Sequence, residues 1–264
     1  AAGNISGSAD VSLFVDSVSP TIQTFSITEC VNSFSSSGCL LAATALKLSW
    51  QSLAGDLDYF ELTNNGQISA TTSTSTIVSI SDNSINTFSI RAKDISGNWS
   101  NASTTTAEIS LMPIVINEIA WAGTAGHSED EWMELFNRTS KEINLNNWVL
   151  YSQTDMKPYI NLTGTIPAKG YYLIERTNDT TVSDISADWK GSFGSGTGMG
   201  LANTGEVLVL SQASTTIDQT PSGSWPGGDS GIYRTMERYD PNSNGNDSSN
   251  WGTNNTIIKN GRNA

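Results

Sequence analysis

Residues 130–152 read DEWMELFNRTSKEINLNNWVLYS, in which apolar segments flank a polar turn. In the first segment Trp132, Glu134 and Phe136 alternate with apolar residues, which is the two-residue period of a β-strand. Elsewhere helical periodicity is nearly absent, and short apolar runs alternate with turns rich in Gly, Asn, Asp and Ser. This pattern predicts an all-β chain built from β-sandwiches.

Further strands are predicted on both sides of this stretch. A strand begins at Ile114, and residues 171–174 (YYLI) and 207–210 (VLVL) are apolar on both strand faces. Strands apolar on both faces lie inside a sheet rather than at its edge. The turn at residues 203–205 leads into the second of them.

The ordered segments of residues 113–264 carry a family resemblance. They read PIVINEIAWAGT, DEWMELFNRTSKEINLNNWVLYS, IPAKGYYLIERT, GLANTGEVLVLSQ, TIDQT, SGSWPGG and RTMERYDP…SNW. This set resembles the bacterial lamin tail domain, an Ig-like β-sandwich. The resemblance implies a second domain over residues 113–264 and a role without hydrolase activity.

An earlier domain is predicted over residues 19–112. Its expected strands cover residues 21–27, 45–50, 57–62, 75–80, 87–93 and 104–111. Leu46, Leu48 and Trp50 share one strand face. The segments LKLSW, LDYFEL and NTFSIRAKDISGNWS resemble the B, C and F–G strands of a fibronectin type III domain. We therefore expect two tandem Ig-like β-sandwiches, the first fibronectin type III-like and the second lamin-tail-like.

Residues 1–18 repeat a pattern found at the end of the first domain. GNIS followed by VSLFV parallels GNWS followed by AEISL, and a proline follows each, at Pro20 and Pro113. The segment is either the last strand of a preceding repeat in a longer surface protein or an added N-terminal strand. A strand with an apolar face needs a partner. It can pair within its own chain or with a sheet edge of a neighbour, which would build a fibre.

The charge balance excludes several partners. The net charge is −13, with 13 basic and 26 acidic residues, so we expect no binding to nucleic acid or to an anionic membrane surface. The sequence contains no run of 18 apolar residues, so no membrane-spanning helix is predicted.

Cys30 and Cys39, the two cysteines, flank a polar loop, and the sequence has neither a CxxC motif nor more than one histidine. A disulfide is favoured over a metal site, which predicts an extracellular or cell-surface location.

Catalytic chemistry has little support. His127 lies in a glycine-rich loop without the GxSxG motif of a serine hydrolase. Several carboxylates cluster within or beside the lamin-tail motifs. They are Glu118, Glu129, Asp130, Glu131 and Glu134. Paired carboxylates can hydrolyse glycosides, but we interpret this cluster as a structural network. No catalytic residue and no cofactor is predicted.

One segment resembles a calcium loop. Residues 240–246 read DPNSNGN, which matches the first half of an EF-hand pattern. The candidate ligands are Asp240, Asn242, Asn244 and Asn246. Trp251 stands where the loop needs a bidentate glutamate. Turns rich in Asn and Gly look the same without metal, so calcium and a metal-free turn are both open.

The function predicted from these features is a non-catalytic secreted or cell-surface module, structural or adhesive, able to assemble into a fibre or surface layer. Its partners would be copies of itself or other cell-surface proteins. One alternative is a targeting or binding appendage of a secreted hydrolase or nuclease. Another is glycan binding through exposed aromatic rings, for which the candidates are Trp99, Trp121, Trp148, Trp189, Trp225 and Trp251.

Overall fold

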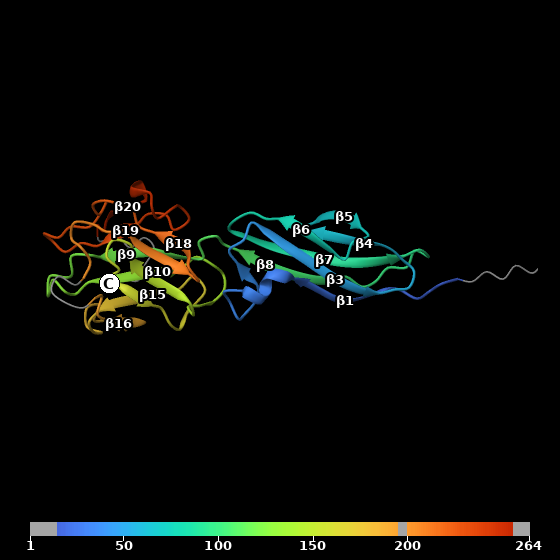
Figure 1. Ribbon diagram of the computed structural model, residues 1–264, viewed down its shortest axis with the longest axis horizontal. Coiled ribbons are helices and arrows are strands. Elements are labelled where there is room, and N and C mark those ends of the chain that lie inside the picture. Colours follow the sequence, from blue (N-terminus) through green and yellow to red (C-terminus); the bar gives the residue numbers. More distant parts are fainter. Residues whose placement is uncertain (1–14, 195–199, 256–264) are drawn as a thin grey trace, which may run out of the picture. The chain divides into compact units, whose positions relative to one another are not determined.

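The structure, a computed structural model, describes residues 15–194 and 200–255. Within these residues it is built from β-strands and two short 3-10 helices, η1 (Thr28–Asn32) and η2 (Ser248–Asn250) (Figure 1). Neither helix is long and apolar enough to cross a membrane. The prediction of an all-β chain of sandwich domains is confirmed. Of the N-terminal strand predicted within residues 1–18, residues 1–14 lie outside the described residues.

Backbone contacts divide the chain into two compact units. Of the described residues, the first unit comprises 15–28, 46–78 and 86–106, and the second comprises 29–45, 79–85, 107–194 and 200–255. Residues 29–45 therefore belong to the second unit although they lie between strands of the first.

The N-terminal strands are β1 (Thr21–Ile27), β2 (Leu40–Leu41), β3 (Ala45–Leu53), β4 (Leu57–Asn64), β5 (Gln67–Thr71), β6 (Ser75–Ser79), β7 (Ser84–Asp94) and β8 (Ser103–Ile109). They form a three-stranded sheet ordered β1-β3-β6 and a five-stranded sheet ordered β2-β8-β7-β4-β5 (Figure 1). Strands β2 and β5 were not predicted. Four of the five β5 side chains are exposed, so the strand has no buried face to mark it in the sequence.

The core of the first unit is centred on Trp50. Its ring lies edge-on to Phe25, with centroids 6.3 Å apart, and to Phe60, at 5.7 Å. Leu46 and Leu48 are fully buried on the same face of β3, as the alternation predicted. Large aromatic rings thus close this sandwich.

The C-terminal strands are β9 (Ile114–Ala120), β10 (Trp132–Asn137), β11 (Ile143–Asn144), β12 (Trp148–Ser152), β13 (Tyr159–Asn161), β14 (Thr165–Ile166), β15 (Tyr171–Arg176), β16 (Trp189–Gly191), β17 (Leu208–Gln212), β18 (Thr215–Gln219), β19 (Met236–Arg238) and β20 (Trp251–Thr253). A six-stranded sheet is ordered β16-β15-β10-β9-β19-β20 and a four-stranded sheet β13-β12-β17-β18. Strands β15 and β17 lie inside their sheets, as predicted from their apolar faces.

Side chains of both sheets form the core of the second unit. Met133 and Leu135 come from the six-stranded sheet, Trp148 and Leu210 from the four-stranded sheet, and all four belong to one buried cluster. The alternation that predicted β10 places Met133 and Leu135 on this inner face.

The predicted disulfide is confirmed, since Cys30 and Cys39 are bonded with their Cα atoms 5.2 Å apart. The loop that they close packs within the second unit. Phe34 lies edge-on to Trp148, with ring centroids 5.8 Å apart, and Leu40 is fully buried in the second unit's core. A segment that precedes β3 thus completes a core formed mainly by residues beyond 107.

We expect Leu40→Ala to destabilise the second unit by about 2–5 kcal/mol, because removing a fully buried leucine side chain leaves a cavity. Scanning calorimetry of the purified chain measures the change. Val31→Ala is the matched control, since Val31 lies in the adjoining disulfide loop with 86% of its surface exposed. Equal unfolding temperatures for both variants would show that the loop contributes nothing to this core.

Candidate functional site

The predicted carboxylates Glu118 and Glu134 lie opposite each other on β9 and β10, and Glu237 of β19 lies opposite Glu118 on its other side. All three are buried. Glu134 accepts a hydrogen bond from Asn117 Nδ2 at 2.8 Å, and Glu118 accepts one from Thr235 Oγ1 at 2.5 Å. The structure thus brings two of the predicted carboxylates together in a row across the six-stranded sheet.

Burial is the main reason that the pKa of Glu118 is raised, and the charge of Glu237 adds to the effect. The hydrogen bonds from Thr235 and Asn254 act in the opposite direction. Raised carboxyl pKa values occur in acid–base sites, but also in structural networks. Here the donors are Thr235 Oγ1, next to β19, and Asn254 Nδ2, next to β20, so the geometry agrees with the interpretation of a structural network.

Another buried carboxylate, Glu131, lies at the end of the loop that precedes β10. It accepts a hydrogen bond from the Leu201 amide at 2.9 Å and lies 3.2 Å from Arg176 Nη1. Burial raises the pKa of Glu131 to about 7, although the Leu201 amide and Arg176 oppose the shift. A Cβ atom on Gly200 would lie 2.4 Å from this carboxylate, so the site requires glycine there.

The remaining predicted residues lie in the exposed turn before β10. His127 is exposed, and its Nδ1 accepts a hydrogen bond from the Glu129 amide at 3.1 Å. Asp130 accepts one from Thr124 Oγ1 at 2.9 Å. Glu129 lies 3.4 Å from Arg176, so the structure places Glu129 and Glu131 around one guanidinium, apart from the row on the sheet.

The calcium-loop candidates form a compact turn after β19. The Asp240 Oδ1 atom accepts hydrogen bonds from the Asn242 amide at 2.9 Å and from Asn242 Nδ2 at 3.0 Å, and Oδ2 accepts one from Ser243 Oγ at 2.8 Å. These bonds hold the pKa of Asp240 below its usual range. Asn246 is exposed. Both carboxylate oxygens of Asp240 therefore accept hydrogen bonds from residues of the same turn.

The backbone carbonyls of this turn also bind protein donors. Arg238 Nη2 donates to Ser243 O at 2.5 Å, and Trp251 Nε1 donates to Gly245 O at 2.6 Å. The Asn244 carbonyl accepts a bond from Asn250 Nδ2 at 3.3 Å. A guanidinium and two neutral donors thus bind the carbonyls of residues 243–245, whereas a calcium loop directs the carbonyl of its seventh position, here Asn246, at the ion. Calcium binding here stays a prediction.

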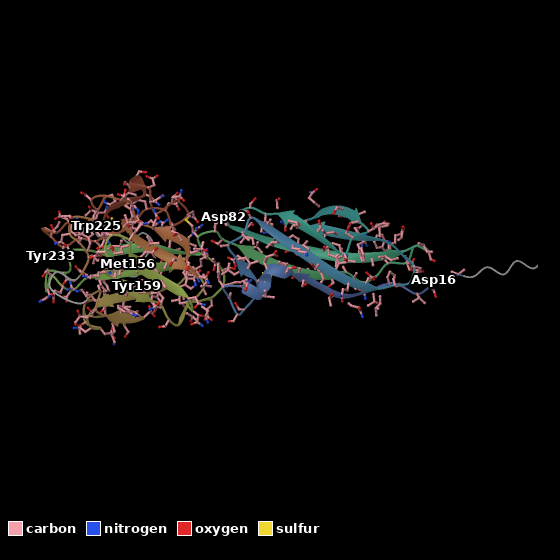
Figure 2. All side chains as sticks on the ribbon, viewed as in Figure 1. Asp16, Asp82, Met156, Tyr159, Trp225 and Tyr233 are labelled. Atoms are coloured by element: carbon pink, nitrogen blue, oxygen red, sulfur yellow. A yellow bond between two sulfur atoms is a disulfide. The ribbon has the colours of Figure 1, made fainter. Side chains whose placement is uncertain are left out.

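A group of carboxylates that the sequence analysis missed lies in the first unit. Asp16, Asp56 and Asp94 each offer a ligand oxygen, and these atoms lie within 4.8 Å of one another; Figure 2 labels Asp16. Asn98 organises the group, since its Nδ2 donates to Asp94 Oδ2 at 2.9 Å and to the Asp16 carbonyl at 3.1 Å. Oxygen ligands of this kind suit Ca²⁺, although acidic groups also cluster without an ion.

The two less exposed members of this group differ in acidity. A hydrogen bond with Asp16, then burial and the charges of Asp16 and Asp94, raise the pKa of Asp56. Burial would raise the pKa of Asp94 as well, but hydrogen bonds from Asn98, Ser96 and Gly97 outweigh it and lower the pKa. No local motif could have revealed the group, because its members come from three distant parts of the sequence.

Removing the Asp56 charge should stabilise the first unit at pH 7 without divalent cations. A raised pKa in the folded state means that Asp56 contributes stability at acid pH that is lost as the pH rises through the folded pKa. We expect Asp56→Asn to raise the Tm at pH 7 in EDTA and to have little effect at pH 3. Thermal unfolding at both pH values measures this.

Millimolar calcium, added to the same samples, separates the two candidate cation sites. Binding raises the Tm by mass action. A calcium-dependent increase that Asp56→Asn removes assigns the ion to the carboxylates of the first unit, and one that Asp240→Asn removes assigns it to the turn after β19. The absence of any increase contradicts the calcium prediction for residues 240–246.

The tryptophans proposed for sugar stacking are used mainly for packing. Trp121, Trp148 and Trp251 are buried. Trp225 stacks on Trp121 with ring centroids 6.3 Å apart, and its Nε1 donates to a backbone carbonyl. Trp99 lies under the Arg91 guanidinium, 4.0 Å from the ring centroid.

The exposed aromatic residues of the second unit are tyrosines. Tyr159, Tyr233 and Tyr239 expose 52%, 41% and 47% of their surface. Figure 2 labels Tyr159 and Tyr233 together with Trp225. Sugar stacking by exposed rings would therefore depend on tyrosine more than on the tryptophans of the sequence analysis.

Comparisons with known proteins identify part of the second unit. Residues 107–223 match the model of the Lamin Tail Domain family, which confirms the predicted resemblance for that segment. No curated protein matches the chain.

Solved structures give distant similarities. The PKD1 domain of the metalloprotease PrtV from Vibrio cholerae is 12% identical with a TM-score of 0.27, and the match covers 35% of this chain and 99% of that one. The chitinase ChiA74 from Bacillus thuringiensis is 18% identical with a TM-score of 0.29. That match covers 59% of this chain and 26% of the chitinase, so the chain spans about a quarter of the chitinase's length. A DUF4876 family protein from Bacteroides thetaiotaomicron is 9% identical with a TM-score of 0.34, over 77% of this chain and 90% of its own.

Proposed function

We propose that this chain is a non-catalytic structural or adhesive module of the cell exterior. The observation that carries the proposal is that buried carboxylates of the chain accept hydrogen bonds from the protein itself. Glu131, Glu118 and Asp218, the groups best suited to acid–base chemistry by burial, all bind protein donors. Carboxylates held in this way stabilise the loops and strands whose donors they bind.

The proposed location follows from the covalent structure and the charge. The Cys30–Cys39 bond suits an oxidising compartment. A net charge of −13 favours solubility and disfavours polyanionic partners. Both features support a protein outside the cell, at its surface or secreted.

We also propose domain boundaries at residues 19–112 and 113–264, with a fibronectin type III-like first domain. The strand order supports this proposal. Strands β3, β4 and β7 contain the segments that resemble the B, C and F strands, and β4 and β7 are neighbours in one sheet while β3 lies in the other.

Assembly through residues 1–18 is part of the proposal. Two edge strands of the first unit could accept an added strand, because among the described residues β5 and β6 are each paired on one side only. Ile68 of β5 and Ile77 of β6 expose 65% and 71% of their surface, so an incoming apolar strand face would cover them. A head-to-tail contact of this kind builds an open fibre.

A substrate panel tests the absence of catalysis. We expect no turnover of polysaccharides, nucleic acids or esters by the purified chain above that of Glu131→Gln and Glu118→Gln, because both carboxylates are buried and held by protein donors. Reproducible turnover that either substitution abolishes would refute the non-catalytic proposal.

Truncation tests assembly. We expect the chain to form fibres visible by electron microscopy and the chain lacking residues 1–18 to sediment as a monomer. Removal of residues 1–10 is the matched control, because it leaves the strand-forming segment VSLFV at 11–15 in place. If the assembly state is unchanged by loss of residues 1–18, subunits are not joined through this segment.

A further inference from the structure

We propose that a pocket beside the Cys30–Cys39 loop binds a neutral glycan. The pocket, here called the loop pocket, has a volume of 360 Å³ and lies within the second unit. One wall comes from the disulfide loop, including Asn32, Phe34 and Ser36, and the other from the turn before β12 and the end of β17. Its volume lies in the range of pockets that hold small molecules.

The lining of the loop pocket is polar but uncharged. The opposite wall carries the amides of Asn146, Asn147 and Gln212. None of the lining residues is an acid, a base or a histidine, in a chain of net charge −13. A charged ligand would find no opposite charge in this lining, whereas a neutral ligand would leave no charge unpaired. This argues for a neutral polar ligand.

Several lining side chains have unused hydrogen-bonding groups. Within residues 15–194 and 200–255, the side chains of Asn32, Ser36, Asn146, Asn147 and Gln212 make no hydrogen bond to the protein. Each amide offers both donors and an acceptor, and a sugar hydroxyl is both donor and acceptor. Neighbouring amides can therefore bind adjacent hydroxyls of one sugar ring.

An aromatic ring supplies the apolar part of such a site. Phe34 is half-buried and is held edge-on by the buried Trp148, at 5.8 Å between ring centroids and an interplanar angle of 69°. Its carbonyl accepts a hydrogen bond from the Asn144 amide at 3.0 Å. An immobilised ring beside free amides suits a ligand with one apolar and one hydroxyl-bearing face, which is the character of a sugar.

The loop that carries half of the pocket is preorganised. The disulfide closes it, and Ser33 Oγ accepts a bond from the Leu40 amide at 2.9 Å and donates to the Gly38 carbonyl at 2.7 Å. A loop already ordered before binding loses little conformational entropy when the ligand binds. The disulfide would therefore contribute to affinity as well as to stability.

A glycan array followed by titration calorimetry tests the proposal. The purified chain is applied to immobilised neutral and acidic oligosaccharides, and the neutral glycan bound most strongly is used as the probe. We expect Asn146→Ala and Gln212→Ala each to raise its Kd about tenfold, because each loses hydrogen bonds to the ligand. Reduction of the disulfide should also weaken binding. Gln153→Ala, an exposed amide of the same unit outside the pocket, should leave the Kd unchanged.

Three results would overturn the loop pocket as a glycan site: an array on which no neutral glycan is bound, binding restricted to acidic glycans, or a Kd that neither pocket variant changes. Loss of binding in Tyr159→Ala alone would place the glycan on the exposed tyrosine instead. Unfolding temperatures equal to wild type confirm that the variants are folded. The structural function proposed above does not depend on this pocket, so each proposal can fail without the other.

Discussion

The ion pair between Asp218 and Arg238 joins the two sheets of the second unit. Asp218 belongs to β18 of the four-stranded sheet and Arg238 to β19 of the six-stranded sheet, and their nearest atoms are 2.6 Å apart with almost no solvent exposure. Ile116 of β9 donates its amide to Asp218 and accepts from Arg238. Removing either partner would leave the other charge buried and unpaired, which is strongly destabilising. The pair therefore fixes β18 against β9 and β19.

The same pair explains a motif that otherwise suggests a metal. Arg238 extends to the Ser243 carbonyl, and a Cβ atom on Gly245 would lie 2.5 Å from an Asp218 oxygen. The Asp-x-Asn-x-Asn-Gly pattern is therefore compatible with a turn folded around a buried guanidinium. Glu131 and Arg176 form a comparable contact at the opposite side of β10, where glycine is again required, at position 200. In both places charge is used to join segments, whereas the lining of the loop pocket is polar and uncharged.

Local pattern was enough to predict about half of the strands in the described residues, including six of the eight N-terminal ones. The alternation in residues 46–50 and 132–136 arises because each strand buries one face, and those faces form the two cores. β5 could not be predicted because it pairs with β4 through its backbone while its side chains stay exposed. β2 is only two residues long, which is too short to show an alternating pattern. Leu40 is buried through its contacts with residues far away in the sequence, so the local sequence could not identify it as a core residue.

The sequence by itself determined the all-β class, the disulfide and the lamin-tail segment, because all three depend on residue types that are close together or follow one another in order. Only the tertiary structure decided that the disulfide loop belongs to the second unit and that Asp16, Asp56 and Asp94 meet. It also decided which carboxylates bind protein donors and which amides face an open pocket. These features depend on contacts between residues far apart in the chain, and strand periodicity carries no information about which distant segments come together.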